Sequence, residues 1–582
     1  MNHTIHTTRR LLKQLLLIAV LLLVQQYGKA AIAPADGAQL NSTQVMFEYD
    51  QVYGATGYRV VIQPAGSKEE TIVQSNSLAI LVKSGLQFGQ SYQWHFEAFK
   101  NKELLFTSEN FTFSIASSYL LDTALFRYKI GVNNKSQRLD NLIFVENLGV
   151  AIDREGTPVW FLPTDSATKA EMKYRNIEMT RNGTITYLLG DDCYEKSVYG
   201  KDLWKAPHDG QVSGDKTDYY HHDFAKLPDG TYVTCGYAYS NQPNILNPSV
   251  SCRVRYNTLI QYNAEGKAIW WWNDKDHFSP QTIFSDITPN DIETGGTHMN
   301  SFFYDQQNDA FLLSFRNISR IIKIDKKTGN IQYQFGKLFD NDTTVLNSTN
   351  CIFSKQHGPV LLPDNNILFY NNNVDAGSKN SVVFPHVVIL SQPLNNKQGK
   401  VIWDYECVTP QFPKGLRGKE GFASQLPNKN ILVCMGGENR TFEVTKDKKI
   451  VWECFFEKFD ASDNEWTPFT NYRAHYTSSM FPQYFTVAKT TESAIVNPKK
   501  VFDELTINND GTDDDTYKVI ITSVRGSIQP QELQVPIKSG TSKNLKIKLQ
   551  SKNGTANDKL MVAITSQSNT TNTKTLVFQI SQ

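Results

Sequence analysis

A repeated element in the middle of the chain constrains its fold more than any other feature. A turn glycine is followed four residues later by an aromatic residue at Gly156/Trp160, Gly266/Trp270, Gly329/Tyr333 and Gly399/Trp403, with Lys448/Trp452 as a degenerate copy. The span from Trp160 to Trp270 is long enough for two units, so these five aromatic residues mark six units, which end near residues 160, 215, 270, 333, 403 and 452. Four-stranded propeller blades take roughly 40–50 residues each, and inserted loops add more. The repeat predicts a six-bladed β-propeller over residues 117–489, in which residues 465–487 complete the first blade.

The regions on either side of the repeat alternate apolar and polar residues, which is the period of a strand with one buried face. The run Tyr92–Ala98 is the clearest example before the repeat, and the runs around Tyr517 and Leu560 are examples after it. Residues 32–116 are similar to a fibronectin type III module, and residues 490–582 predict a second, immunoglobulin-like β-sandwich. Neither region contains a reactive cluster, so we expect both to be structural or adhesive in an all-β protein.

The N-terminus has the layout of a secretory signal peptide. Basic residues at positions 9, 10 and 13 precede an apolar run at 15–24, and small residues follow up to Ala31. The apolar run is short for a membrane span, which disfavours an uncleaved anchor. We therefore expect residues 1–31 to be removed, and the mature protein to be periplasmic or secreted without a membrane span.

Composition excludes several classes of function. The formal net charge is +1, whereas a nucleic-acid binder needs a basic surplus for its phosphate contacts. There is no P-loop or glycine-rich nucleotide fingerprint, so we expect no nucleotide cofactor. The seven cysteines are an odd number, so disulfides would leave at least one thiol unpaired or bonded elsewhere, and no C-x-x-C motif indicates a zinc ribbon.

A second repeated element, a strand with a tight turn and a returning strand, places histidines at the same position of three consecutive units. It occurs at His222–Gly230, at His357–Asn365 and, without the proline, at His298–Asp305. Arg175 occupies this position in the second unit and Gly421 in the sixth. Because equivalent positions in a ring of blades point at the same channel mouth, we expect the three imidazoles to converge there.

The hairpin that begins at His298 brings an arginine to the same place. With its turn at residues 306–308, residue 298 lies opposite Arg316 on the returning strand. Asn300 points to the same face one step deeper. His221, the neighbour of His222, faces the other way by strand alternation and is expected to support the site from behind.

This combination favours an oxyanion over a metal ion. Three histidines alone could bind zinc, so a zinc hydrolase is one alternative. A fixed guanidinium opposes a divalent cation, however, and it donates in a planar, bidentate manner to tetrahedral oxyanions. Imidazole can act as a nucleophile or proton carrier. The cluster therefore suits sulfuryl or phosphoryl transfer, while a non-catalytic propeller that binds anionic glycans is the alternative from another class.

Three stretches resemble the bacterial arylsulfate sulfotransferase family: Thr297–Asn300 with Arg316, Ile321–Gly329, and Gln356–Gly358. The similarity covers roughly residues 120–490. The resemblance implies a six-bladed propeller in the periplasm that needs no 3′-phosphoadenosine phosphosulfate. It further implies that an aryl sulfate gives its sulfuryl group to a histidine, from which a phenolic acceptor collects it in a ping-pong cycle.

The resemblance also implies a set of site residues. His357 corresponds to the histidine that becomes sulfated, and His222 to a further channel histidine; which histidine carries the proton stays open. The implied catalytic residues are His357, His298, Arg316 and His222, and the implied substrate-binding residues are Asn300 and Arg473, the latter within a Tyr-Arg-Ala motif.

The chain also departs from the family. Its members carry a short-range cysteine pair upstream of the nucleophile, whereas here only Cys351 is near, so a bridge to Cys407 or none remains open. The expected partners are a small aryl sulfate donor and a phenolic acceptor, with no cofactor or metal. Whether the chain forms a homodimer is left open.

Overall fold

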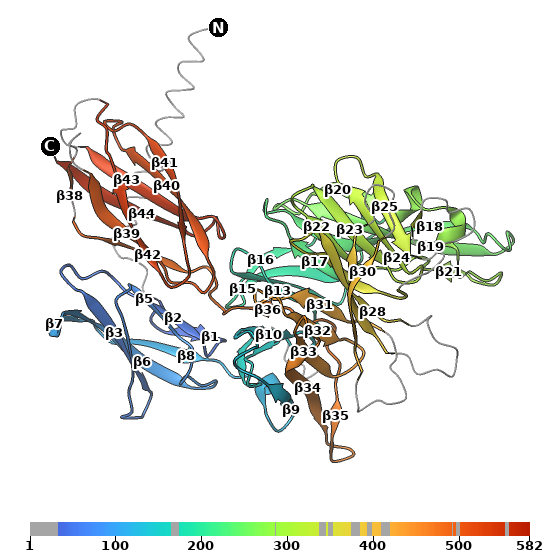
Figure 1. Cartoon of the computed structure of the whole chain (residues 1–582), viewed down its shortest axis with the longest axis horizontal. Helices are drawn as coiled ribbons and strands as arrows, with labels where there is room; N and C mark the ends of the chain where they lie inside the picture. Colours follow the sequence, from blue (N-terminus) through green and yellow to red (C-terminus); the bar gives the residue numbers. More distant parts are fainter. Residues whose placement is uncertain are drawn as a thin grey trace, which may run out of the picture. The chain divides into compact units, whose positions relative to one another are not determined.

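The computed structural model describes residues 33–163, 174–285, 287–336, 345–346, 353–373, 384–392, 399–408, 419–491, 493–495, 501–552 and 558–581. This part of the chain is all-β, as the sequence predicts, with only short helical turns between its strands (Figure 1). The predicted signal peptide and Cys351 lie outside the described residues. Among the residues that are described, no helix is long and apolar enough to cross a membrane.

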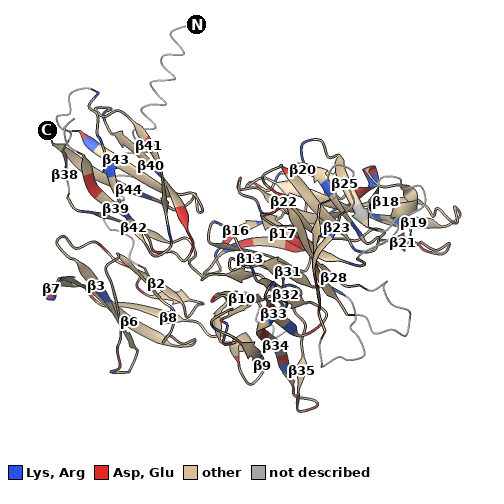
Figure 2. Cartoon of the chain, viewed as in Figure 1, with Lys and Arg blue, Asp and Glu red and all other residues tan. Residues whose placement is uncertain are grey.

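The chain divides into two compact units, Ser118–Met480 and a second formed by Met1–Ser117 together with Phe481–Gln582. Basic and acidic side chains are scattered among the strands of both units, consistent with the near-zero net charge (Figure 2).

Strands of the unit Ser118–Met480 form six sheets within the described residues. The first three, in order of pairing, are β12 (Pro158–Phe161), β11 (Val150–Ile152), β10 (Leu142–Val145) and β36 (Tyr476–Thr477); β13 (Tyr174–Met179), β14 (Thr184–Leu189), β15 (Asp192–Ser197) and β16 (Asp202–Lys205); and β17 (Tyr220–Lys226), β18 (Tyr232–Pro243), β19 (Ser251–Tyr262) and β20 (Ala268–Asn273), with β21 (Glu293–Thr294) beside β19. Short helical turns follow β20 at η3 (Asp274–Asp276) and α2 (Pro280–Ile283), and others are η1 (Tyr119–Leu121) and η2 (Glu146–Leu148).

The remaining three sheets continue the same order along the chain. They are β22 (Met299–Asp305), β23 (Ala310–Phe315), β24 (Arg320–Asp325), β25 (Ile331–Gly336) and β26 (Val345–Leu346); β27 (His357–Leu361), β28 (Asn366–Asn371), β29 (His386–Ser391) and β30 (Val401–Glu406); and β31 (Phe422–Gln425), β32 (Ile431–Met435), β33 (Arg440–Val444), β34 (Ile450–Asp460) and β35 (Glu465–Pro468), with β9 (Phe126–Asn133) on β34. β36 pairs with β10, so the first sheet is completed from the far end of the unit, within the segment expected to close it.

Aromatic residues at or near the repeat position connect several of the sheets to the next one along the chain. Trp160 of the first sheet donates its indole N–H to the carbonyl of Val198 in the second, at 2.9 Å. Trp403 of the fifth sheet donates to Lys446 in the sixth, at 2.8 Å. The same kind of hydrogen bond thus recurs: a large indole ring fills the space between two sheets, and its N–H donates to a turn carbonyl of the next sheet. In the third sheet Trp272, two residues after the repeat position, makes the equivalent bond to Gly329 at 3.0 Å.

The same bond joins the last sheet to the first. Trp452 donates its indole N–H to the carbonyl of Arg154 at 2.8 Å, and the Arg154 guanidinium lies 4.3 Å over the Trp452 ring. Arg154 also forms a fully buried ion pair with Glu443 of β33, 2.6 Å from Nη2 to Oε2, and bonds to Asn141 at 2.6 Å. Burial lowers the pKa of Arg154 to about 10, but Glu443 favours its charged form. The two ends of the unit are therefore linked at a desolvated charge pair.

The other unit contains two hydrophobic cores between sheets. Around the first core, which includes Trp94, lie β1 (Ala38–Leu40), β8 (Phe111–Ile115), β6 (Ser91–Lys100), β3 (Gly57–Pro64), β4 (Thr71–Ser75) and β7 (Glu103–Thr107), with β2 (Val45–Glu48) and β5 (Ala79–Val82). Around the second, which includes Tyr517, lie β37 (Phe485–Lys489), β39 (Phe502–Asn509) and β42 (Ser542–Ile547), with β38 (Ser493–Ile495), β44 (Thr573–Ser581), β43 (Lys559–Ser566), β40 (Asp515–Ser523) and β41 (Gln531–Ile537).

One predicted boundary differs from the structure. We expected the repeat region to extend to residue 489, yet β37 pairs with β39 and belongs to the C-terminal core. The reason is packing, because the Phe485 ring is buried 4.8 Å from the ring of Tyr517, and Val487 joins the same core. The first unit ends at Met480 instead.

Removing the charge of Glu443 should destabilise the unit more than removing an exposed charge. In Glu443→Gln the Arg154 guanidinium stays buried without a counter-ion, and we expect a loss of about 3–5 kcal/mol in the free energy of unfolding. The control is Asp202→Asn, because Asp202 is 72% exposed where it pairs with Lys196, and its loss should cost less than about 1 kcal/mol. Denaturant unfolding measures both, and equal effects would contradict the role given to this pair.

Candidate functional site

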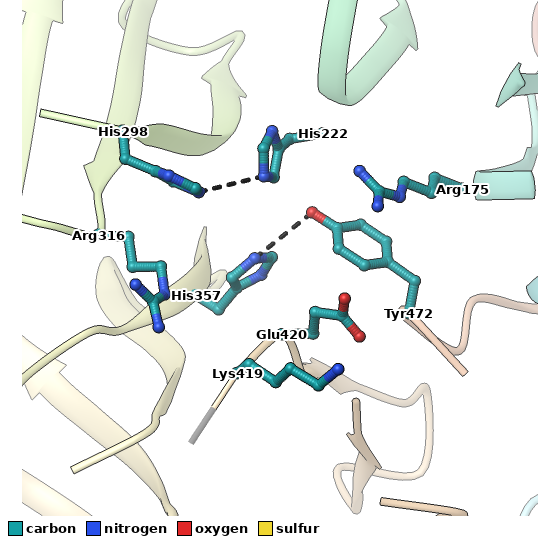
Figure 3. A pocket seen from close by; sticks show the side chains of 8 residues that line it. All are labelled: Arg175, His222, His298, Arg316, His357, Lys419, Glu420 and Tyr472. Atoms are coloured by element: carbon teal, nitrogen blue, oxygen red, sulfur yellow. Dashed lines mark hydrogen bonds between the residues drawn. The ribbon is translucent and has the colours of Figure 1, made fainter. Parts of the chain in front are cut away.

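A pocket of about 180 Å³, open on one side to solvent, is lined by residues from all six sheets or the segments beside them (Figure 3). Its lining residues are Arg175, His222, His298, Arg316, His357, Lys419, Glu420 and Tyr472. Arg175, His222 and His357 lie in the first strands of their sheets, β13, β17 and β27, and His298 and Glu420 come just before β22 and β31. Four of the six predicted site residues line it: His222, His298, Arg316 and His357.

Two of the histidines have a backbone conformation that is unfavourable for residues with a side chain. The φ angles of His222 and His298 are 60° and 57°, and both lie next to β-bulges in their strands. Such angles cost about 1–3 kcal/mol for a non-glycine residue and persist where the surroundings fix them. The register predicted for the hairpin is confirmed, because the Arg316 N–H donates to the His298 carbonyl at 2.8 Å.

The imidazoles of His222 and His298 are in direct contact. Their Nε2 atoms are 3.2 Å apart and their ring centroids 4.8 Å apart, with the ring planes near perpendicular (Figure 3). One of the two nitrogens therefore carries a hydrogen and the other accepts it. The convergence expected from the repeat is present in the pocket.

His357 faces a tyrosine. Its Nε2 is 3.4 Å from the hydroxyl of Tyr472, and the two rings meet edge to face, 5.4 Å between centroids (Figure 3). Its Nδ1 is buried and has no hydrogen-bond partner among the described residues. Nε2 is thus the nitrogen of His357 that faces the pocket and the Tyr472 hydroxyl.

The backbone on both sides of His357 is fixed by the neighbouring strand. Asn300 Nδ2 donates to the Gln356 carbonyl at 2.8 Å, and the N–H of Gly358 donates to Ser301 Oγ at 3.1 Å. Gly358 has a φ of 57°, and a Cβ there would lie 2.5 Å from the Phe422 ring, so glycine is required. These hydrogen bonds to the residues before and after His357 fix the position of its imidazole.

Burial keeps the pocket histidines neutral. Loss of solvent, with Arg316 adding to it, lowers the pKa of His298 to about 4. Burial likewise holds the pKa values of His222 and His357 well below the usual 6.5. It raises the pKa of Tyr472, so that hydroxyl remains protonated and able to donate. The pocket therefore combines neutral imidazoles, which have free lone pairs, with guanidinium groups that favour an anion.

Two predicted substrate-binding residues do not line the pocket. Asn300 is fully buried and makes the bond to Gln356 described above. Arg473 is also buried; it pairs with Asp223 at 3.1 Å and donates to Asn176 Oδ1 at 2.7 Å and to the Asn300 carbonyl at 3.2 Å. Asn300 was expected on the same face as His298, and the family resemblance implied a substrate-binding role for Arg473. Instead, Asn300 Nδ2 and both Nη atoms of Arg473 bond to protein groups behind the pocket. Both position the pocket residues next to them.

Four lining residues were not among the predicted set. Arg175 occupies the repeat position of the second unit, so the repeat itself was the signal for it, and its guanidinium lies 5.0 Å over the Tyr472 ring. Tyr472 adjoins Arg473 in the closing segment. Lys419 and Glu420 precede β31, and nothing in their sequence distinguishes them from other surface residues.

The sequence left open a cysteine bridge and a metal centre, and both can be compared with the described residues. Cys407 is buried as a free thiol, and its predicted partner Cys351 lies outside the described residues. In the part of the chain that the structure describes, no group of three or more His, Cys, Asp or Glu side chains is arranged to hold a metal ion.

The fold and the site define an all-β protein with a pocket of neutral histidines and arginines suited to bind and transfer an oxyanion. Residues 131–407 match the sequence profile of the family described as Arylsulfotransferase (ASST), a range that includes Arg175 and all three pocket histidines. The part of the chain that carries the pocket is therefore similar to the arylsulfotransferases, and this match supports the sulfotransferase class of enzymes.

Other comparisons add less. None of the curated proteins compared with the chain matches it. A solved structure of a Bacteroides caccae protein of unknown function is 12% identical, covers 59% of this chain and 100% of its own, and has a TM-score of 0.35. A streptogramin B lyase is 13% identical over 57% of this chain and 88% of its own, with a TM-score of 0.30. Kuenenia stuttgartiensis hydrazine synthase is 10% identical over 53% and 99%, with a TM-score of 0.29.

The lowered pKa of His298 predicts the pH range in which its ring takes up a proton. Because the unfolded chain binds this proton near pH 6.5 and the folded chain only near pH 4, the ring should stay neutral at pH 5.5, and its contribution to stability should fall as the pH drops from 6.5 through 4. Ring ¹⁵N NMR measures this, with His298→Asn to assign the signal.

His386 is the matched control, since its hydrogen bond to Asp404 raises its pKa above the usual value and it should be protonated at pH 6.5. A His298 midpoint near 6.5 would contradict a desolvated pocket.

Proposed function

We propose that this protein transfers a sulfuryl group from an aryl sulfate to a phenolic acceptor by a ping-pong cycle through a sulfohistidine at His357. The observation that carries the proposal is the neutral imidazole of His357, whose Nε2 shares a cationic pocket with a tyrosine hydroxyl. The match of residues 131–407 to the arylsulfotransferase profile favours sulfate over phosphate. No nucleotide donor is needed, because an aryl sulfate already carries an activated sulfuryl group.

In the first half of the cycle the donor binds with its sulfate oxygens towards the guanidinium groups of Arg316 and Arg175. The lone pair on His357 Nε2 attacks sulfur, the bond between sulfur and the aryl oxygen breaks, and the phenolate leaves with the electron pair. Guanidinium and hydroxyl donors stabilise the negative charge that develops. Holding donor and imidazole together replaces a collision in water with a positioned reaction.

In the second half the acceptor phenol loses its proton as its oxygen attacks sulfur. The nitrogen–sulfur bond breaks and its electrons return to Nε2, so the neutral imidazole is restored. Dividing the transfer between two nucleophiles lets donor and acceptor use the same pocket in turn. A small pocket suits single aryl groups as both partners.

We further propose that the six sheets are the blades of a β-propeller. The bonds from Trp160, Trp272 and Trp403 to the next sheet, and from Trp452 back to Arg154, support a closed ring. A ring places the starts of its innermost strands around one channel, which accounts for lining residues drawn from every sheet. The two cores of the other unit are proposed as a fibronectin III-like sandwich over residues 32–116 and an immunoglobulin-like sandwich from β37 onward, since β37 joins that core.

The proposed setting is outside the cytoplasm, either periplasmic or secreted. The signal-peptide pattern of residues 1–31 supports export. Aryl sulfates and phenols are small and need no nucleotide pool, so the reaction can proceed there.

Substituting His357 tests the proposal. His357→Asn should lower the release of 4-nitrophenol from 4-nitrophenyl sulfate, in the presence of a second phenol, by roughly 10³-fold or more, because the covalent carrier is lost. His386→Asn is the control, since that ring bonds to Asp404 at 2.8 Å and does not line the pocket. Steady-state release, after the first equivalent, should require the acceptor and follow parallel-line ping-pong kinetics.

Other outcomes identify the alternatives. Saturable binding of sulfated glycans without turnover, with His357→Asn unaffected, would indicate a non-catalytic binding protein. Loss of activity with a chelator and recovery with zinc would indicate a metal hydrolase.

A further inference from the structure

Two adjacent histidines, His221 and His222, are in contact, but only the second lines the pocket. Their Nδ1 atoms are 2.7 Å apart. His221 is buried, its Nε2 lies 3.1 Å from the Gly236 carbonyl oxygen, and its ring stacks on Tyr237 with 3.8 Å between centroids. The proposed reaction assigns no role to His221, yet its ring contacts His222, the Gly236 carbonyl and Tyr237.

These contacts determine which nitrogens carry hydrogen. A carbonyl oxygen only accepts, so Nε2 of His221 must be the protonated nitrogen. Burial lowers the pKa of His221 to about 3, so the ring is neutral and carries a single hydrogen. Its Nδ1 is therefore bare and can only accept, which requires the hydrogen between the two rings to be on His222 Nδ1.

The same argument continues to the pocket. His222 is also neutral, so its Nε2 is bare and must accept from the Nε2–H of His298, 3.2 Å away. The other nitrogen of a neutral His298, Nδ1, then has a free lone pair. The three hydrogen-bonded rings thus leave one basic nitrogen with a free lone pair, His298 Nδ1. The Gly236 carbonyl determines that this nitrogen is Nδ1 and not Nε2.

We propose that His221 is a positioning residue that, through His222, fixes the tautomer of His298, and that His298 Nδ1 is the base that takes the proton of the acceptor phenol. This inference rests on the proposed function. In the step, the acceptor O–H proton moves to Nδ1 while the acceptor oxygen bonds to sulfur and the nitrogen–sulfur bond to His357 breaks. The imidazolium formed keeps its Nε2–H bond to His222. Once the product has left and the pocket is empty again, the imidazolium releases this proton to solvent.

The charges around His298 explain why it is neutral at rest and basic when needed. The groups that face it are cationic: Arg316, Arg255, Lys355 and Arg175. Those around His222 are His221, His298, His357 and Arg175. They repel a proton from the empty pocket, but a sulfuryl group on His357 brings negative charge that favours the protonated form. The base therefore becomes effective only after the carrier is loaded.

The test separates the two half-reactions. His221→Phe keeps a ring on Tyr237 but removes the acceptor for His222, so transfer from sulfated enzyme to unsubstituted phenol should fall by roughly 10–100-fold, within the range of general base catalysis. The burst of 4-nitrophenolate from 4-nitrophenyl sulfate should change less than about threefold, since that leaving group needs no proton. His221→Gln, whose amide oxygen can accept from His222, should restore most of the loss.

His277→Phe is the matched control, because the His277 ring stacks on Trp272 with 4.7 Å between centroids, away from the pocket. It should leave both steps unchanged. Equal losses in both half-reactions of His221→Phe, or no rescue by His221→Gln, would overturn the proposal. If the wild-type protein transfers no sulfuryl group at all, the proposed function fails instead.

Ring ¹⁵N NMR of the wild-type protein is a second measurement that needs no variant to fold. It should show hydrogen on Nδ1 of His222 and on Nε2 of His298. The opposite tautomers would overturn the proposal, even if the chain proves to be an active sulfotransferase.

Discussion

The ion pair between Arg473 and Asp223 is the interaction on which the pocket depends. Asp223 follows His222 in the chain and Arg473 follows Tyr472, so one pair of charges fixes two lining residues. Arg473 also bonds to Asn176 and to the carbonyl of Asn300, which in turn holds the residue before His357. Burial opposes the charge, but Asp223 and Glu146 raise the pKa of Arg473, so it remains a cation. Such a buried pair is costly to break, and this explains how a rigid pocket can be built from separate sheets.

Desolvation gives that rigid pocket its chemistry. Imidazoles in water would be partly protonated near neutral pH, whereas those of His298 and His357 are kept neutral by burial and by neighbouring guanidinium groups. The guanidinium groups that repel a proton also attract a sulfate, so one set of charges makes a nucleophile and binds its substrate. The positive φ angles of His222 and His298 show that the backbone is held against its preference to bring the rings together.

Much of this arrangement follows from the sequence because it repeats. Periodicity gave the strands, and equal spacing from a turn brought His222, His298 and His357 to one place; counting across a hairpin placed Arg316 opposite His298. Asn300 and Arg473 do not line the pocket, because a bulge and the return of the chain from its far end decide where they point, and the short motifs that contain them do not encode this. Lys419 and Glu420 reach the pocket only through tertiary structure. The boundary at residue 489 was wrong because β-strand patterns do not say which core a strand joins.

Mass spectrometry after brief exposure to an aryl sulfate tests the central claim most directly. The protein is mixed rapidly with 4-nitrophenyl sulfate in the absence of acceptor and then digested at alkaline pH, which preserves the acid-labile nitrogen–sulfur bond. The peptide that contains His357 should carry one added sulfuryl group. The added mass should disappear when a phenol is supplied before quenching. An unmodified His357 peptide in enzyme that is turning over, or a sulfuryl group on another residue, would contradict the account.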